Sequence, residues 1–131
     1  MEAKTTCVVL IEDDQAMNYF HQRLFEKQNF ADSVLSFTNA AAALNEIQKL
    51  KNIKKLSIFL DLNMPQMNGW QFIEALASLK LEQDLQLQLF VLSSSVNPND
   101  LLKAKQIPEI TDYLTKPLSI EMLNTINTKH S

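Results

Sequence analysis

Five short apolar runs of strand length alternate with five segments of helical periodicity along this chain. The runs cover residues 7–11, 33–37, 55–61, 86–93 and 111–115, and the helical segments begin near Asp14, Asn39, Asn68, Pro98 and Ser119. This alternation predicts an α/β domain with a mostly parallel sheet and helices on both of its faces. Right-handed crossovers between the strands would give a doubly wound, three-layer domain. The first run, CVVLI, is apolar throughout, as expected for a strand that is buried on both faces.

The helical segments carry start signals and apolar stripes. Asp14, Asn39 and Ser119 are suitable N-caps, and Asn68 forms a potential capping box with Gln71. Apolar residues that recur at helical spacing are predicted to face the sheet. These residues are Met17, Phe20 and Leu24 in the first helix, Ala43, Ile47 and Leu50 in the second, Trp70, Ile73 and Leu76 in the third, and Ile120, Leu123 and Ile126 in the last. The polar residues Asn18, Gln22, Arg23 and Glu26 would lie on other faces of the first helix.

Length and composition favour one ordinary globular domain over residues 1–131. The chain is 46% hydrophobic and has no low-complexity tract, and 131 residues can bury a core without disulfides or a structural metal. Its net charge of -3 makes nucleic acid an unexpected partner. The one cysteine, Cys7, lies within an apolar run, which suits a buried thiol in a reducing cytosol. We find no export signal or membrane span in the sequence, so a cytoplasmic location without membrane attachment is expected.

Polar residues follow the predicted strands at the ends where a doubly wound sheet binds its ligands. They are Glu12, Asp13 and Asp14 after the first strand, Asp61 at the end of the third, Ser93, Ser94 and Ser95 at the end of the fourth, and Lys116 with Pro117 after the fifth. Most of them have an ordinary structural explanation, but Glu12 and Asp13 do not. Asp14 fits a helix N-cap, Asp61 a solvated turn acid, the serines a polar strand end, and Lys116 a solvated cation.

Convergence of these residues would favour a metal and a phosphoryl group. Two carboxylates about 4 Å apart repel each other by about 4 kcal/mol at an effective dielectric constant near 20, so converging acids favour a bound cation. Oxygen ligands favour Mg²⁺. Zinc is not expected, because Cys7 is predicted to be interior and neither His21 nor His130 is predicted at this edge. A lysine ammonium and a serine hydroxyl suit phosphoryl oxygens. A carboxylate among these groups could attack phosphorus and form an acyl phosphate.

Four sequence motifs resemble the receiver domain of two-component response regulators, in that family's order and approximate spacing. The motifs are LIEDD, FLDLNMPQMNGW, FVLSSS and DYLTKP. The resemblance covers nearly the whole chain and implies a flavodoxin-like sheet with the strand order 2-1-3-4-5. It also implies a signalling protein that accepts phosphate from a sensor histidine kinase or phosphotransfer protein and contacts a downstream protein target. Such a protein would have no enzyme activity beyond self-phosphorylation and autodephosphorylation. The triple serine before VNPND is similar to small standalone members of the family.

The resemblance also implies a role for individual residues. Asp61 would be the phosphoacceptor, and Mg²⁺ would be held by Glu12, Asp13, Asp61 and the backbone carbonyl of Asn63. Ser93 would contact the phosphoryl group, where threonine is commoner in the family, and Lys116 would pair with it. Ser94 stands where the family usually has a small apolar residue. Tyr113 would change rotamer on activation, although a half-buried strand aromatic is an equal alternative. The bond between Lys116 and Pro117 would be cis, and the output face would be the fourth helix, fifth strand and fifth helix.

Two other functions remain as alternatives. Haloacid-dehalogenase-like phosphatases also use an aspartate nucleophile with Mg²⁺, but they place a second aspartate two residues later, where this chain has Asn63. Their acidic pair also comes last in the chain, whereas Glu12 and Asp13 come first here. The other alternative is a receiver-like binding module that is never phosphorylated and acts by contact alone.

Overall fold

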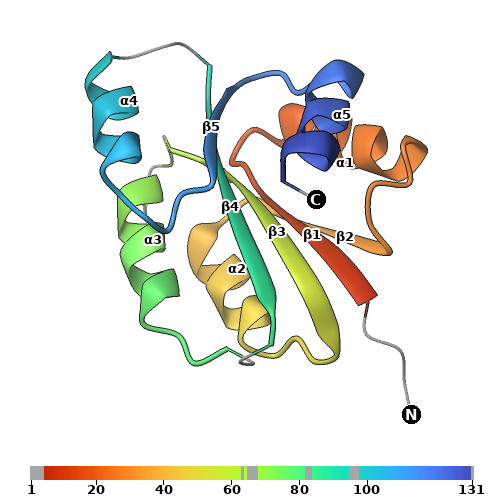
Figure 1. The fold of residues 1–131 in the computed structure, drawn as a ribbon, viewed down its shortest axis with the longest axis horizontal. Coiled ribbons are helices and arrows are strands. Elements are labelled where there is room, and N and C mark those ends of the chain that lie inside the picture. The colour runs from red at the N-terminus through yellow and green to blue at the C-terminus, as the bar shows by residue number, and fades with distance from the viewer. Residues whose placement is uncertain (1–4, 63, 65–67, 82–83, 95–97, 131) are drawn as a thin grey trace.

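The computed structural model describes residues 5–62, 64, 68–81, 84–94 and 98–130 (Figure 1). Over these residues the chain forms five strands and five helices in strict alternation. The elements are β1 (Thr5–Ile11), α1 (Gln15–Lys27), β2 (Ser33–Phe37), α2 (Ala40–Ile47), β3 (Ile53–Asp61), α3 (Gly69–Ala77), β4 (Gln86–Ser93), α4 (Pro98–Lys105), β5 (Asp112–Thr115) and α5 (Ile120–Lys129). All pairings between neighbouring strands are parallel. The predicted α/β class is confirmed.

The strand order of the sheet is β2-β1-β3-β4-β5, as the receiver resemblance implies. The chain therefore leaves β1 toward one edge of the sheet and returns across β1 to form β3. Such a reversal opens a crevice at the carboxyl ends of the strands, where ligands bind in folds of this kind. The register makes these ends level, because Ile11 pairs with Leu60, Asp61 with Leu92, and Ser93 with Thr115.

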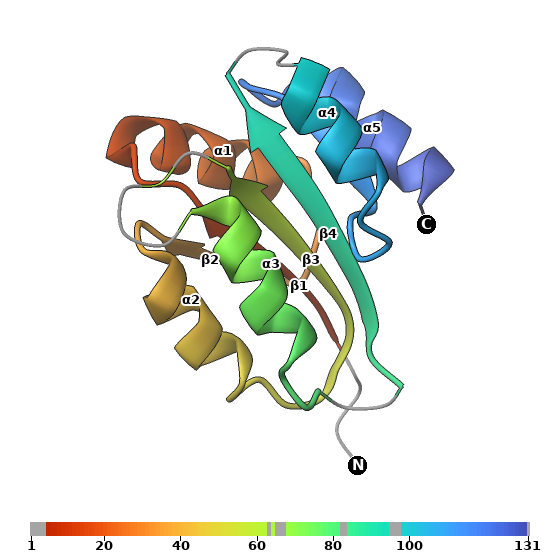
Figure 2. The same ribbon diagram turned by 90° about the vertical axis from the view of Figure 1, so that its left-hand side faces the viewer.

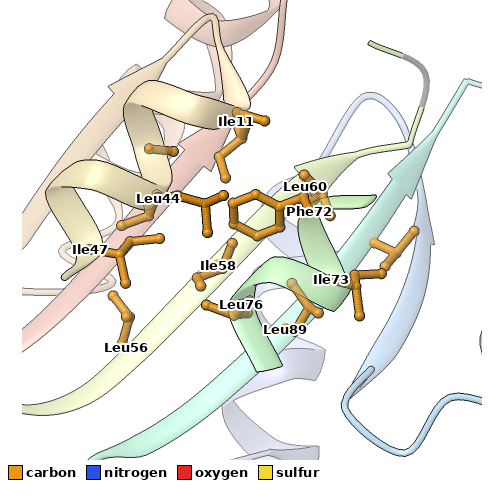
Figure 3. Packing of buried hydrophobic residues seen from close by; sticks show 14 of the residues in the cluster. Ile11, Leu44, Ile47, Leu56, Ile58, Leu60, Phe72, Ile73, Leu76 and Leu89 are labelled. Atoms are coloured by element: carbon orange, nitrogen blue, oxygen red, sulfur yellow. The ribbon is translucent and has the colours of Figure 1, made fainter. Parts of the chain in front are cut away.

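Helices cover both faces of the sheet (Figures 1 and 2). On one face, α2 and α3 pack against alternate residues of β1, β3 and β4. Figure 3 shows Leu44 and Ile47 from α2 and Phe72, Ile73 and Leu76 from α3 directed toward these strands. On the other face, residues of α1 and α5 pack against the intervening strand positions. The three central strands are thus buried on both sides, which explains the continuous apolar runs 7–11 in β1, 58–60 in β3 and 89–92 in β4.

The predicted helix starts are confirmed. The side chains of Asp14, Asn39 and Ser119 each accept a backbone hydrogen bond as N-caps, and Asn68 and Gln71 form the reciprocal capping box. These bonds satisfy N–H groups that have no partner within a helix. The second helix ends at Ile47, earlier than the predicted stripe that reached Leu50.

Two predicted helix faces are partly wrong. Phe20 is 51% exposed, whereas Asn18 and His21 are buried on the inner side of α1 with Phe25. The inner side of α1 meets polar loop groups as well as the sheet, so polar side chains occupy positions that periodicity assigned to the surface. Ile120 is 48% exposed, because Leu118, just before α5, takes the buried position instead.

Across the described part of the chain, none of the helices combines the length and the apolar character that crossing a membrane requires.

Candidate functional site

Three acidic side chains meet at the carboxyl edge of the sheet. Glu12 directly follows β1, Asp61 is the last residue of β3, and both are buried, whereas Asp13 is exposed. Carboxylate oxygens of the three residues lie within 4.8 Å of one another. The neighbouring Asp14 instead caps α1, with its side chain accepting a hydrogen bond from the backbone N–H of Met17 at 3.1 Å. Sheet topology therefore brings together two segments that are about 50 residues apart in the chain.

Lys116 and Ser93 complete the cluster. The ammonium of Lys116 lies 2.7 Å from an oxygen of Glu12 and 3.5 Å from an oxygen of Asp61. Ser93 is buried at the end of β4, and its backbone carbonyl accepts a hydrogen bond from the N–H of Lys116 at 2.8 Å. The bond between Lys116 and Pro117 is cis, as the resemblance implies. Ser94 is exposed, while Asn63 and Ser95 lie outside the described residues.

The charges of Glu12, Asp61 and Lys116 act on one another. Burial raises the pKa of Glu12 to about 7; a hydrogen bond with Asp61 and the charge of Asp61 also raise it, whereas Lys116 lowers it. Burial alone would lower the pKa of Lys116, but the hydrogen bond to Glu12 and the negative charge of Asp61 outweigh it, so this pKa is raised. The ammonium group of Lys116 thus offsets the electrostatic repulsion between the neighbouring carboxylates of Glu12 and Asp61.

The donor set of this cluster fits Mg²⁺. Glu12, Asp13 and Asp61 offer only carboxylate oxygens, which are the ligands that hard divalent cations prefer. Zinc sites use cysteine or histidine more often, and neither residue type belongs to this group of ligands. A divalent cation would also relieve the repulsion that raises the pKa of Glu12.

Gly69, the only glycine in the chain, fits closely against the segment that follows Asp61. Its backbone N–H donates to the carbonyl of Leu62 at 3.0 Å. A Cβ added to Gly69 would lie 2.7 Å from Cδ2 and 2.8 Å from Cα of Leu62. The glycine is therefore needed for a close approach between the start of α3 and the chain beside Asp61.

We expect Gly69→Ala to destabilise the protein by about 1–3 kcal/mol, because the backbone of Leu62 has to shift to admit the methyl group. Helix propensity alone predicts the opposite sign, since alanine stabilises a helix by about 1 kcal/mol relative to glycine. Urea unfolding of the two proteins measures the difference. A more stable variant would show that the close approach does not constrain this position.

Tyr113 lies on β5, in register with Val91 of β4. Its ring is half-buried and packs at the edge of the core on the α2 and α3 side. Its hydroxyl is buried without a hydrogen-bond partner among the described residues. An unpaired buried hydroxyl is destabilising, typically by about 1–3 kcal/mol. A rotamer that gives this hydroxyl a hydrogen-bond partner would therefore be more favourable.

His21 was predicted to lie away from this edge, and that prediction is wrong. Its Nε2 accepts a hydrogen bond from the backbone N–H of Leu118 at 3.0 Å, two residues after Lys116. Burial, followed by the positive charge of Lys116, lowers the pKa of His21 to about 4. A histidine between apolar positions on a helix gives no sequence signal for this contact, because Leu118 is almost 100 residues away in the chain.

The titration of His21 makes stability depend on pH. Its pKa is lower in the folded protein than in the unfolded chain, so the unfolded chain binds more protons between about pH 6.5 and pH 4. The contribution of His21 to the free energy of unfolding is therefore complete above this pH range and is lost as the pH falls through it. From about pH 7.5 to pH 5 we expect a loss of about 2 kcal/mol.

His21→Gln isolates this effect, because glutamine keeps an acceptor for Leu118 but does not titrate. The raised pKa of Glu12 acts in the opposite direction, since it favours the folded state as the pH falls, but Glu12 is present in both proteins. The difference in unfolding free energy between wild type and variant, measured with urea at the two pH values, reports His21. An equal pH dependence would contradict the assignment.

Comparisons with known proteins agree with the fold and the motifs. The family model of the response regulator receiver domain matches residues 8–127. The two-component response regulator ARR10 of Arabidopsis thaliana is 30% identical over 119 residues, which cover 91% of this chain and 20% of that protein. The probable methanogenesis regulatory protein FilR2 of Methanothrix harundinacea is 28% identical, over 88% of this chain and 75% of that protein.

Two similar solved structures are a response regulator receiver protein from Dyadobacter fermentans and a two-component response regulator from Cytophaga hutchinsonii. Both are 28% identical to this chain, with TM-scores of 0.84 and 0.83. The alignments cover 95% and 96% of this chain and 96% of each of the other chains. Family model, sequence motifs and fold agree, and the chain therefore belongs to the response regulator receiver domains, a phosphoacceptor signalling family.

Proposed function

We propose that this protein receives a phosphoryl group on Asp61 from the phosphohistidine of a sensor histidine kinase or phosphotransfer protein. Mg²⁺ would be held by Glu12, Asp13, Asp61 and the backbone carbonyl of Asn63. When bound, the ion would neutralise charge on the phosphoryl oxygens. The observation that carries the proposal is the position of the Asp61 carboxylate, which lies close to two other acids and 3.5 Å from the Lys116 ammonium.

The chemistry follows from these positions. An oxygen of Asp61 attacks phosphorus while the bond from phosphorus to the donor breaks, which leaves an acyl phosphate and the free donor. Lys116 then pairs with a phosphoryl oxygen, and the hydroxyl of Ser93 donates a hydrogen bond to another. Burial of Asp61 and Ser93 limits the access of bulk water to the new bond.

Phosphorylation would also provide the signal. The acyl phosphate carries about two negative charges where the carboxylate of Asp61 carried one, and its phosphoryl oxygens beside Ser93 and Lys116 would draw the segment after β4 inward. Tyr113 would then turn into the space that this movement leaves. Its buried hydroxyl supports this step, because in the present rotamer that group finds no hydrogen-bond partner among the residues that the structure describes. The changed surface would be α4, β5 and α5, and the signal would leave through contact with a downstream protein. We further propose that residues 1–131 act as one receiver unit without other enzyme activity.

Intact-protein mass spectrometry after incubation with Mg²⁺ and acetyl phosphate tests the proposal. We expect one phosphate adduct, and we expect EDTA to prevent it. Absence of the adduct under conditions that label a control receiver would favour the contact-only binding module. Sustained hydrolysis of p-nitrophenyl phosphate would instead favour the phosphatase alternative.

A further inference from the structure

The inner side of α1 carries two buried polar residues, Asn18 and His21, and each bonds a backbone group of a different segment. The amide nitrogen of Asn18 donates to the carbonyl of Phe37 at 3.1 Å, and the same carbonyl accepts the N–H of Glu12 at 3.0 Å. His21, nearly one turn further along α1, bonds instead to Leu118, beyond Lys116. Apolar packing of α1 does not explain why Asn18 and His21 are buried, because Phe25 is the buried apolar residue of this helix.

The hydrogen bond of His21 defines its chemical state. Nε2 accepts from a backbone N–H, so it carries no proton, and the neutral ring has its proton on Nδ1. The side chain is only 1% exposed, so its acceptor is shielded from competing water. The lowered pKa agrees with a neutral imidazole, which does not repel the nearby ammonium of Lys116.

The segment 116–118 is held at two points. On one side, the N–H of Lys116 donates to the carbonyl of Ser93 in β4 at 2.8 Å. On the other side, the N–H of Leu118 donates to His21 in α1 at 3.0 Å. The side chain of Lys116 extends between these two points to Glu12 and Asp61. Loss of the contact with α1 would remove one of these two backbone hydrogen bonds and would leave a buried N–H without an acceptor.

We propose that His21 is a positioning residue: by accepting the N–H of Leu118, it fixes the 116–118 segment against α1 and directs the ammonium of Lys116 toward Asp61. The role in phosphoryl transfer rests on the function proposed above, whereas the effect on the position of Lys116 does not. The residue acts through Lys116 and touches neither the phosphoryl group nor the acceptor carboxylate.

Two substitutions of His21 separate positioning from packing. His21→Leu keeps a buried side chain of similar size without an acceptor, whereas His21→Gln keeps an acceptor within reach of Leu118. We expect His21→Leu to form the Asp61 adduct from acetyl phosphate about tenfold more slowly at saturating Mg²⁺, because small displacements of a catalytic group cause losses of this size. His21→Gln should restore the rate to within about twofold of wild type.

A double substitution tests whether the effect passes through Lys116. Lys116→Met removes the ammonium, so His21→Leu should slow the reaction no further in that background. An undiminished effect of His21→Leu in the absence of Lys116 would overturn the proposal. Equal rates for wild type and His21→Leu, measured on folded protein, would overturn it as well.

A second measurement needs neither Mg²⁺ nor a phosphodonor. The NMR signals of Lys116 Cε and Nζ report its contacts with Glu12 and Asp61. They should shift in His21→Leu but not in His21→Gln. Tyr19→Leu is the control on the same helix, because Tyr19 is 65% exposed on α1, and it should leave the Lys116 signals in place. Unchanged signals in His21→Leu would overturn the proposal. Failure of the wild type to accept phosphate would overturn only the proposed function, since the NMR comparison still decides the position of Lys116.

Discussion

Asp61→Asn should eliminate the phosphate adduct, with a loss of labelling greater than about 100-fold. The amide is nearly isosteric with the carboxylate, but it is a far weaker nucleophile toward phosphorus. The buried position at the end of β3 is kept, so the fold around Glu12 and Lys116 is preserved. The measurement is intact-protein mass after incubation with Mg²⁺ and acetyl phosphate.

Asp14→Asn is the matched control for this experiment. It makes the same chemical change close to the cluster, but Asp14 serves as the N-cap of α1 and asparagine is an equally good cap. Its labelling should stay within about twofold of wild type. An adduct of equal occupancy in Asp61→Asn would identify another acceptor, which peptide mapping would locate at Glu12 or Asp13.

The largest effect on stability is expected for Phe59→Ala, which should lower the free energy of unfolding by about 3–5 kcal/mol. Phe59 is fully buried on β3 and stacks on Phe90, with ring centroids 4.7 Å apart and planes at 14°. Its ring also contacts Phe25 of α1, with centroids 4.8 Å apart, and lies edge-on to Phe30 at 6.3 Å. Truncation would remove the centre of this aromatic cluster. The loss would be a large share of the roughly 5–15 kcal/mol that stabilises a domain.

Phe20→Ala provides the same chemical change at an exposed position of α1. Because the ring of Phe20 is mostly in solvent, we expect a change within about 0.5 kcal/mol. Urea unfolding of Phe59→Ala and Phe20→Ala compares the loss of unfolding free energy at a buried and at an exposed phenylalanine. A loss at Phe20 as large as that at Phe59 would contradict the observed orientation of α1.

The contrast between Phe20 and His21 shows that apolar periodicity predicts the presence of a helix better than it predicts which residues are buried. The spacing of Met17, Phe20 and Leu24 indicates a helix correctly, and Leu24 packs against the core, but Phe20 is exposed whereas His21 is buried. Periodicity reflects only side-chain hydropathy, whereas burial on α1 also depends on hydrogen bonds to backbone groups of distant segments. Asn18 donates to the carbonyl of Phe37 and His21 accepts the N–H of Leu118, and neither bond is visible in the local sequence.

The cluster at the carboxyl edge of the sheet was more predictable from the sequence than the buried face of α1. Acids at the ends of the first and third apolar runs, serines after the fourth and a lysine after the fifth all fall at one edge of a parallel sheet. Parallel topology alone places these ends on the same side, so the approach of Glu12, Asp13, Asp61 and Lys116 follows from the order of elements. Their roles in metal and phosphate binding stay predictions until the labelling experiments are done.

The sequence by itself determined the strands, the helix caps and the edge at which the polar residues gather. These features depend on local preferences: continuous apolar runs are buried in a parallel sheet, and Asp, Asn and Ser satisfy the free N–H groups of a helix start. Only the tertiary structure decided that Gly69 serves a close approach to Leu62, that His21 faces the segment after Lys116, and that the hydroxyl of Tyr113 is buried without a partner in the described part of the chain. Each of these features depends on how the elements pack against one another in space. A local sequence pattern does not encode that packing.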